Sequence, residues 1–376
     1  MNSSKPSKRP KVDYWLMLKD IEITNFRGFE ATKFSGFKKV NLIGGQNNAG
    51  KTAFLEAVLL NNCPKSRTII ELKRIRKEGS DVVKAMPERA WDSLFLNQDK
   101  RTTIKITGTS IQNINTIVEI LVCHSISLLK EILEDEEEAR KLLALISKNE
   151  PMSSVLQVRV IQDNQETSRY PVIATSDGML IKDIPDYNNL PIIPSFARLS
   201  NKDLTEEYDK ARLNDKDEEV LKAFKILDPS IEKVESFSIG EPTLYLVRKE
   251  RKGRLPLSLF GDAINRVAAI MLKLINNDYN FLLIDEIENG IHYTKQGEFW
   301  EHLFKLASEL DIQIFATTHS LEMIKAFTAT GVSKYPDMGA YFEIARKPRN
   351  HSIIGINRDL ETLKYAIEHG KGVRGE

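Results

Sequence analysis

The sequence predicts an α/β protein in which a mixed sheet is flanked by helices. Three short apolar runs carry this prediction, within Lys39–Gly44, Phe281–Ile284 and Ile312–Ala316. Runs of this length suit strands that are buried on both faces. Helical spacing begins at Lys51 after the first run and at Leu321 after the third. Strands that alternate with helices are typical of parallel or mixed sheets covered by helices.

The first apolar run leads into a loop that fits G-x-x-x-x-G-K-[ST] at every fixed position, from Gly45 to Thr52. In such a loop the backbone N–H groups surround a polyphosphate, and the helix dipole adds a favourable field. Lys51 would then contact the β and γ phosphates, and Thr52 would bind magnesium. A chance glycine-rich turn is the alternative, but it would not explain the strand before the loop and the helix after it. The loop therefore predicts binding of ATP with Mg²⁺.

The second run ends in two adjacent acidic residues, Asp285 and Glu286. Carboxylates at the end of a buried strand are costly unless a metal or ligand uses them. We expect Asp285 to hold magnesium opposite Thr52, and Glu286 to polarise the attacking water. The alternative is an ordinary strand that ends in a charged turn. Glu288, two positions further on, is interpreted as a solvated turn residue.

The third run is followed by His319, at the tip of its predicted strand. A lone histidine in such a place is more often structural. Its position about one helix beyond the acidic strand favours a second interpretation, in which it contacts the γ-phosphate and senses its loss.

A fourth segment, Gly253–Ile275, places a turn with serine and glycine before a long apolar helix. The start of such a helix is another anion site. Because the chain already has a phosphate loop, we expect this turn to serve the nucleotide of a second subunit. A capped core helix is the alternative.

The stretches NFRGF, GGQNNAGKT, LPLSLFGDAINRV, FLLIDEIENGIH and IFATTHSLE together resemble the ABC-type ATPase heads of the RecF, SMC and OLD group, and in particular the OLD-like stand-alone ATP-binding proteins of bacteria. The resemblance covers roughly residues 17–60 and 235–330. It implies a P-loop NTPase of ABC-ATPase head type that dimerises head to tail around ATP, as a dimer or a higher even oligomer. Two departures are Ala263, where the family usually has glycine, and Tyr293, where it often has proline.

The resemblance also implies site residues. Asp285 and Thr52 would hold the metal, Glu286 would be the catalytic base and His319 the switch histidine. Asn289–His292 would take the place of the dimer-contacting loop. A glutamine loop is not evident, and Gln98 is a guess for it. The remaining residues expected at the nucleotide are Arg27, Gly45, Asn47, Asn48, Ala49, Gly50, Lys51, Ala53 and, from the opposite subunit, either Ser258 or the pair Gly261 and Asp262.

Composition indicates which partners and which cell compartment to expect. The 376 residues carry 54 basic and 53 acidic side chains, which argues against a strongly basic nucleic-acid binder. Two cysteines do not make a disulfide framework, and no run is apolar enough to span a membrane. We therefore expect a cytoplasmic protein with no membrane contact.

Four segments follow from these patterns: a disordered basic leader at 1–16, an N-terminal ATPase lobe at 17–120, a helical arm and insertion at 121–235, and a C-terminal lobe at 236–376. The arm is the amphipathic stretch Ser125–Lys148, and a hairpin and further helical spacing follow it. Only 57 residues follow His319, too few for the nuclease domain of longer OLD proteins, which would need about 100. The pair Asp215 and Asp217 is interpreted as solvated surface in a helical stretch.

Three functions follow. The first is an ATPase that regulates a separate effector, such as a nuclease or toxin, in bacterial anti-phage defence. The second is a RecF-like repair clamp that acts directly on DNA. The third is a nucleotide-binding scaffold with little turnover, which the intact Lys51, Asp285, Glu286 and His319 disfavour.

Overall fold

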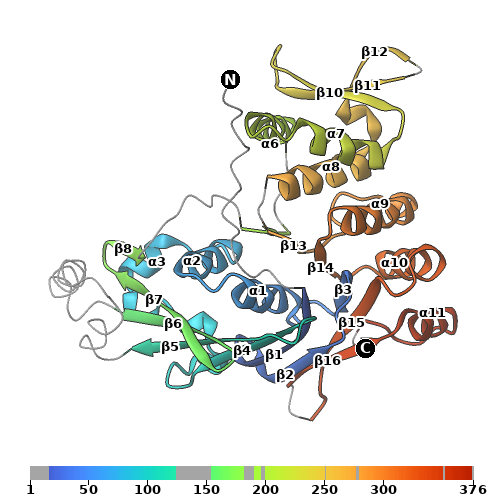
Figure 1. Cartoon of the computed structure of the whole chain (residues 1–376). Coiled ribbons are helices and arrows are strands. Elements are labelled where there is room, and N and C mark those ends of the chain that lie inside the picture. The colour runs from blue at the N-terminus through green and yellow to red at the C-terminus, as the bar shows by residue number, and fades with distance from the viewer. Residues whose placement is uncertain are drawn as a thin grey trace, which may run out of the picture.

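The computed structural model describes most of the chain. Its residues are 17–123, 154–181, 190–195, 200–249, 251–276, 279–349 and 352–374. They form three sheets with their helices (Figure 1). The expected leader, and the expected arm helix Ser125–Lys148, lie outside the described residues.

A six-stranded sheet forms the centre of the site-bearing part, in the order β16-β15-β3-β14-β13-β9. Five of its strands are parallel, and β16 pairs antiparallel with β15 at one edge. Parallel strands share the direction of their carboxyl ends, so the ends of β3, β13 and β14 meet at one edge of the sheet. The strands are β3 (Val40–Gly45), β9 (Ile192–Ile193), β13 (Phe281–Ile284), β14 (Gln313–Thr318), β15 (Gly339–Arg346) and β16 (Ile353–Arg358).

A second, antiparallel sheet has seven strands in the order β2-β1-β4-β5-β6-β7-β8. Helix α1 (Lys51–Asn62) contacts strands of both sheets and so lies between them. Phenylalanines fill this layer; the rings of Phe34 and Phe54, for example, meet edge to face at 4.7 Å. The strands are β1 (Leu18–Phe26), β2 (Phe29–Ser35), β4 (Ile104–Ser110), β5 (Asn115–Cys123), β6 (Ser154–Gln162), β7 (Gln165–Thr175) and β8 (Gly178–Ile181).

Helices cover the other face of the central sheet, as Figure 1 shows for α8 to α11. The rings of Trp300 and Phe327 pack at 4.8 Å between two of these helices. Ser320 caps one helix by accepting a hydrogen bond from the Met323 N–H at 3.1 Å. The helices are α8 (Asp262–Ile275), α9 (Gln296–Glu309), α10 (Leu321–Lys334) and α11 (Leu360–Glu368).

A third, three-stranded sheet lies above α6, α7 and α8 in Figure 1. Its strands are β10 (Ile231–Phe237), β11 (Thr243–Arg248) and β12 (Arg251–Pro256), and its helices are α6 (Asn201–Leu213) and α7 (Asp217–Leu227). Among the described residues, the other α-helices beside α1 are α2 (Ser66–Ile75) and α3 (Ser80–Ala85).

The mixed sheet flanked by helices confirms the expected fold class, and the hairpin β6–β7 confirms the pattern predicted after the arm. The expected segment boundaries at residues 120 and 235 fall inside β5 and β10, so sheets continue across both. Among the described residues, no helix is long and apolar enough to cross a membrane.

Asp215 and Asp217 are both exposed, which confirms their interpretation as solvated surface. Asp215, with a φ of 56°, lies in the short turn between α6 and α7, and Asp217 is the first residue of α7. Lys216 between them is buried and donates from Nζ to the Ile275 carbonyl, which ties the turn to α8.

Candidate nucleotide-binding site

The phosphate loop joins β3 to α1 and depends on glycine at two positions. Gly45 and Gly50 have φ values of 154° and 112°, which side chains disfavour. A Cβ on Gly45 would also lie 2.7 Å from the Ile344 carbonyl oxygen. Gly50 is the N-cap residue of α1, and no side chain accepts a cap hydrogen bond there. The first N–H groups of the helix can therefore donate to an anion.

Lys51 lies within this loop. Its Nζ donates to the carbonyls of Gly45 at 2.8 Å and Gln46 at 2.9 Å. Burial lowers the pKa of Lys51, and nearby carboxylates, Glu288 foremost, oppose that effect. The ammonium is therefore held where the loop would surround a phosphate.

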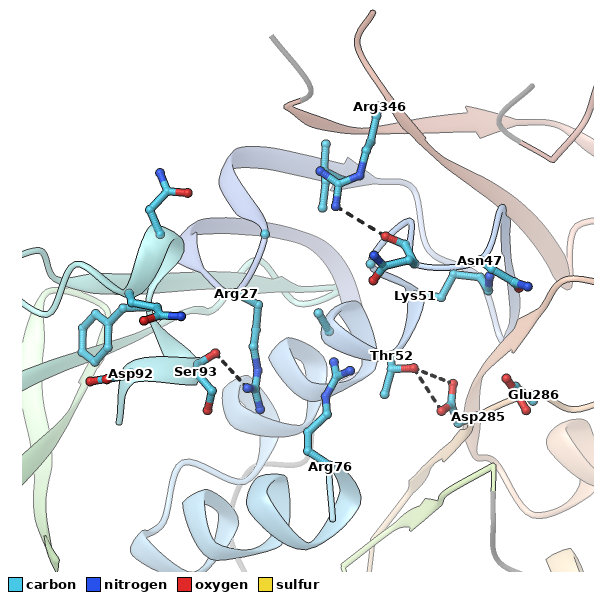
Figure 2. A pocket seen from close by; sticks show the side chains of 18 residues that line it. Arg27, Asn47, Lys51, Thr52, Arg76, Asp92, Ser93, Asp285, Glu286 and Arg346 are labelled. Carbon is cyan, nitrogen blue, oxygen red and sulfur yellow. Dashed lines mark hydrogen bonds between the residues drawn. The ribbon is translucent and has the colours of Figure 1, made fainter. Parts of the chain in front are cut away.

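Thr52 and Asp285 meet as the sequence predicts. The Thr52 hydroxyl lies 3.1 and 3.2 Å from the two carboxylate oxygens of Asp285 (Figure 2). The Thr317 hydroxyl donates to one of these oxygens at 2.6 Å. Asp285 is only 5% exposed, and burial raises its pKa, although both hydroxyls oppose the shift. A buried carboxylate bonded to hydroxyls offers hard oxygen ligands, so these residues fit Mg²⁺. Thr52 and Asp285 would hold that ion.

Glu286 follows in a strained conformation. Its φ is 48°, a left-handed value that costs a non-glycine residue roughly 1–3 kcal/mol. Its N–H donates to the Thr317 hydroxyl at 2.9 Å, and Asn289 Nδ2 donates to its carboxylate at 3.0 Å. Asn289 also donates to the Ser195 carbonyl at 3.1 Å. The carboxylate is thus held half-buried on the wall of the same cleft as Thr52.

The interpretation of Glu288 as a solvated residue is wrong. Its side chain is 10% exposed; one oxygen accepts a hydrogen bond from the His319 N–H at 2.8 Å and lies 2.9 Å from Nδ1 of the ring, close enough for an ion pair. The reason is the pairing of β13 with β14, which brings the residues after each strand together. The position of Glu288 in a predicted turn does not reveal that His319 lies beside it in the fold.

The cleft in front of these residues has a volume of about 610 Å³. That is within the range usual for small-molecule sites. Asn47, Asn48, Gly50, Lys51, Thr52 and Ala53 line it together with Asp285 and Glu286. Gln98, the guess for a glutamine loop, also lines it, in a left-handed conformation with φ of 60°.

Arg27 lines the cleft as expected, but its guanidinium has protein partners. Nε donates to Glu56 at 3.0 Å and Nη1 to the Ser93 carbonyl at 2.8 Å. Arg76 reaches the same Glu56 at 2.7 Å from the end of α2 and also lines the cleft (Figure 2).

Sequence reasoning did not find Arg76 or Arg346. Arg346 lies on β15 and donates to the Asn48 carbonyl at 3.4 Å. Both residues belong to basic stretches that resemble ordinary surface, and only the fold brings them to the phosphate loop.

The predicted signature turn lies elsewhere. Ser258 is exposed in a 3-10 turn, Leu257–Phe260, and Gly261 with φ of 86° precedes α8, which Asp262 begins. Neither Ser258 nor Gly261 is among the described residues that line the cleft of their own chain.

Fold and site together are those of an ATPase of the ABC-type P-loop class. The chain belongs to the family described as AAA domain, putative AbiEii toxin, Type IV TA system, whose model matches residues 40–325.

Two curated proteins and a solved structure are similar to the chain. An "ATP/GTP phosphatase" of Helicobacter pylori is 26% identical over 340 residues, which cover 82% of this chain and 87% of the relative. The "DNA replication and repair protein RecF" of Idiomarina loihiensis is 24% identical over 123 residues, 31% of this chain and 35% of that protein. Among solved structures, the SMC head domain from Thermotoga maritima aligns with a TM-score of 0.42 at 11% identity, covering 92% of this chain and 100% of that one.

Proposed function

We propose that the protein hydrolyses ATP at this cleft, and that Glu286 is the general base. The observation that carries the proposal is the contact of Thr52 with Asp285, with Glu286 as the next residue on the wall of the same cleft. Thr52 and Asp285 are 233 positions apart in the sequence, and the fold brings them into contact.

Each residue has a physical role in the proposal. The loop N–H groups and Lys51 bind the phosphates, and Thr52 with Asp285 hold Mg²⁺, which would neutralise phosphate charge when bound. Glu286, restrained by Asn289, accepts a proton from the attacking water. His319 is proposed to report on the γ-phosphate.

The first experiment replaces the base. Glu286→Gln should retain ATP binding and slow hydrolysis by about 100-fold or more, as loss of a positioned base does. Lys51→Ala should instead weaken binding itself. GTP is tested beside ATP, because the Helicobacter relative is named an ATP/GTP phosphatase. Hydrolysis by Glu286→Gln at the wild-type rate would refute the role of Glu286.

The active form is proposed to be a head-to-tail dimer or a higher even oligomer. The turn around Ser258 and Gly261 is exposed and does not line its own cleft, so it is free to complete the cleft of a second copy. Specific activity should then rise with protein concentration.

Mixing inactive variants tests the shared site. Lys51→Ala subunits mixed with Ser258→Arg subunits should regain part of the activity, since one of the two composite sites in a hybrid is intact. Activity that is independent of concentration, with no rescue on mixing, would contradict the dimer.

The ATPase is further proposed to regulate a separate effector protein, a nuclease or a toxin, in anti-phage defence. The family description, which names a putative toxin of a toxin–antitoxin system, supports this context. A nucleotide switch acts on a partner only through contacts that differ between its two states. Proteins that co-purify with the chain in ATP but not in ADP would identify the effector.

Direct action on DNA is the second candidate, supported by the partial similarity to RecF. It predicts DNA binding that weakens steeply with salt. The assay uses the purified protein with ATP, Mg²⁺ and plasmid or linear DNA. DNA cleavage that disappears with a substitution outside the ATP site would show that the effector is part of this chain. A scaffold with little turnover would show nucleotide binding but no dependence of hydrolysis on Glu286.

A further inference from the structure

The turn after β13 is anchored to the end of β14 by backbone contacts. The Ile287 N–H donates to the Thr317 carbonyl at 2.9 Å, and Ile287 itself is fully buried. The turn closes on itself through the Ile291 N–H, which donates to the Glu288 carbonyl at 3.0 Å. The backbone of Glu288 is therefore fixed relative to the strand that ends just before His319.

The side chain of Glu288 uses this fixed position to hold His319 at two points. A single oxygen, Oε1, accepts a hydrogen bond from the backbone N–H at 2.8 Å and lies 2.9 Å from ring Nδ1. The backbone bond and the ring contact together restrict both the backbone and the χ angles of the histidine. The His319 side chain is 46% exposed, so core packing alone does not fix its ring orientation.

The contact also selects a tautomer. A carboxylate oxygen 2.9 Å from Nδ1 favours a proton on that nitrogen, because an unprotonated Nδ1 would place its lone pair beside the negative oxygen. Nε2 is then the ring nitrogen left to contact a ligand, and it can donate to a phosphate oxygen when the ring carries both protons. The other carboxylate oxygen, Oε2, is buried and has no hydrogen-bond partner among the described residues. Such a burial is costly and needs a functional or structural reason.

We propose that Glu288 is a positioning residue for His319, which it holds in one orientation with the proton on Nδ1. The inference deepens the proposed ATPase function and rests on it for its kinetic consequence. Glu288 acts through the histidine and does not itself contact the nucleotide in this proposal.

A competing explanation is the charge of Glu288. It is the foremost of the carboxylates that favour the charged form of Lys51, so its loss would also change the phosphate loop. Glu288→Gln separates the two explanations, because glutamine retains an acceptor oxygen for His319 and loses the charge. Glu288→Ala loses both.

The kinetic experiment compares these variants in the full chain. Glu288→Ala should lower kcat by roughly 10- to 100-fold, the usual effect of losing an outer partner of a functional histidine, with KM nearly unchanged. Glu288→Gln should stay within a few-fold of wild type. The double variant Glu288→Ala/His319→Ala should be no slower than His319→Ala alone, because a positioning residue has no effect once its target is absent. Glu298→Ala is the matched control, since the exposed Glu298 lies 3.8 Å from His302, binds Lys295 at 3.0 Å and does not line the cleft; it should leave kcat unchanged.

A spectroscopic experiment reads the tautomer without turnover. The ring nitrogens of the six histidines are observed by ¹⁵N NMR, and the His319 signals are assigned by their loss in His319→Asn. Wild type and Glu288→Gln should carry the proton on Nδ1, and Glu288→Ala should lose that preference. If Glu288→Ala does not fold, Glu288→Met replaces it, as methionine has similar volume and no acceptor oxygen.

Each result decides the proposal. An unchanged tautomer in Glu288→Ala, additive losses in the double variant, or equal losses in the glutamine and alanine variants would overturn it. Absence of ATP turnover in the wild type would instead refute the proposed function, while the tautomer measurement would still test the role of Glu288.

Discussion

The buried carboxylate of Glu56 offers a quantitative test of how α1 is held beneath the phosphate loop. Glu56 is 0% exposed, one helical turn beyond Thr52, and it binds two guanidinium groups. Arg27 donates to it at 3.0 and 3.3 Å, and Arg76 at 2.7 and 3.1 Å. The perturbation is Glu56→Ala, which leaves both arginines without this partner.

The magnitude follows from burial. Arg27 is 10% exposed and cannot turn to water, and its other carboxylate, Glu78, lies 3.5 Å away and is shared with Lys73. Loss of Glu56 therefore resembles a broken buried ion pair, which costs about 3–5 kcal/mol. Arg76 is 35% exposed and can be hydrated, so it adds little to that cost. We therefore expect Glu56→Ala to lower the free energy of unfolding by about 3–5 kcal/mol. Glu56→Gln retains an acceptor and should cost less.

Urea unfolding at constant m-value is the assay. Glu71→Ala is the control, because it removes a carboxylate whose partner, Arg74, is 59% exposed, and should cost about 1 kcal/mol or less. Extrapolated free energies of unfolding carry an error of about 10–15%. If the free energy of unfolding of Glu56→Ala lies within about 1 kcal/mol of the wild-type value, the buried network does not stabilise α1 as reasoned.

Three further predictions concern stability and reactivity. Burial raises the pKa of Asp285, so folding favours its protonated form and the ionised form at neutral pH costs stability. Asp285→Asn should therefore raise the melting temperature in the absence of magnesium. It should also abolish the stabilisation by Mg²⁺ with ATP, and calorimetry would show both effects. Gly44→Ala should strongly destabilise the folded protein, since its Cβ would lie 1.9 Å from the Tyr341 hydroxyl. Gly297→Ala in α9 should instead stabilise the protein by up to about 1 kcal/mol in thermal unfolding, because its Cβ would meet no atom within 4 Å. Burial raises the pKa of the Cys63 thiol far above its usual range, so a thiol reagent at neutral pH should label it only after unfolding; rapid labelling of the native protein would contradict its 2% exposure.

Much of the site could be predicted from the sequence because its chemistry is local. Gly45–Thr52 is a contiguous loop whose glycines are needed for backbone conformations that side chains disfavour. Asp285 and Glu286 directly follow a fully apolar strand, so their place at the edge of the sheet followed from the strand itself. The pairing of Thr52 with Asp285 across 233 residues was expected, because parallel strands bring their carboxyl ends to one edge.

Other features depended on neighbours that are distant in the chain. In the seven-stranded sheet, β5 pairs with β6, which follows the stretch expected to be a helical arm. The alternation of apolar and polar residues within one strand does not show which strand it pairs with. Arg76 and Arg346 have the composition of surface residues, and only packing against α1 and β3 brings them to the cleft.

By itself, then, the sequence determined the contiguous elements: the phosphate loop, the strand that carries Asp285, and the order of the motifs, because these rest on backbone conformation and on the apolar character of adjacent residues. Only the tertiary structure decided which charges became buried and what they bind. Glu56 could not be told from a solvated helix residue, nor Glu288 from a solvated turn residue, by their neighbours in the chain. The free energy of a buried carboxylate depends on the partners that surround it, and those partners, Arg27 and Arg76 for one and His319 for the other, are brought in by separate strands and helices.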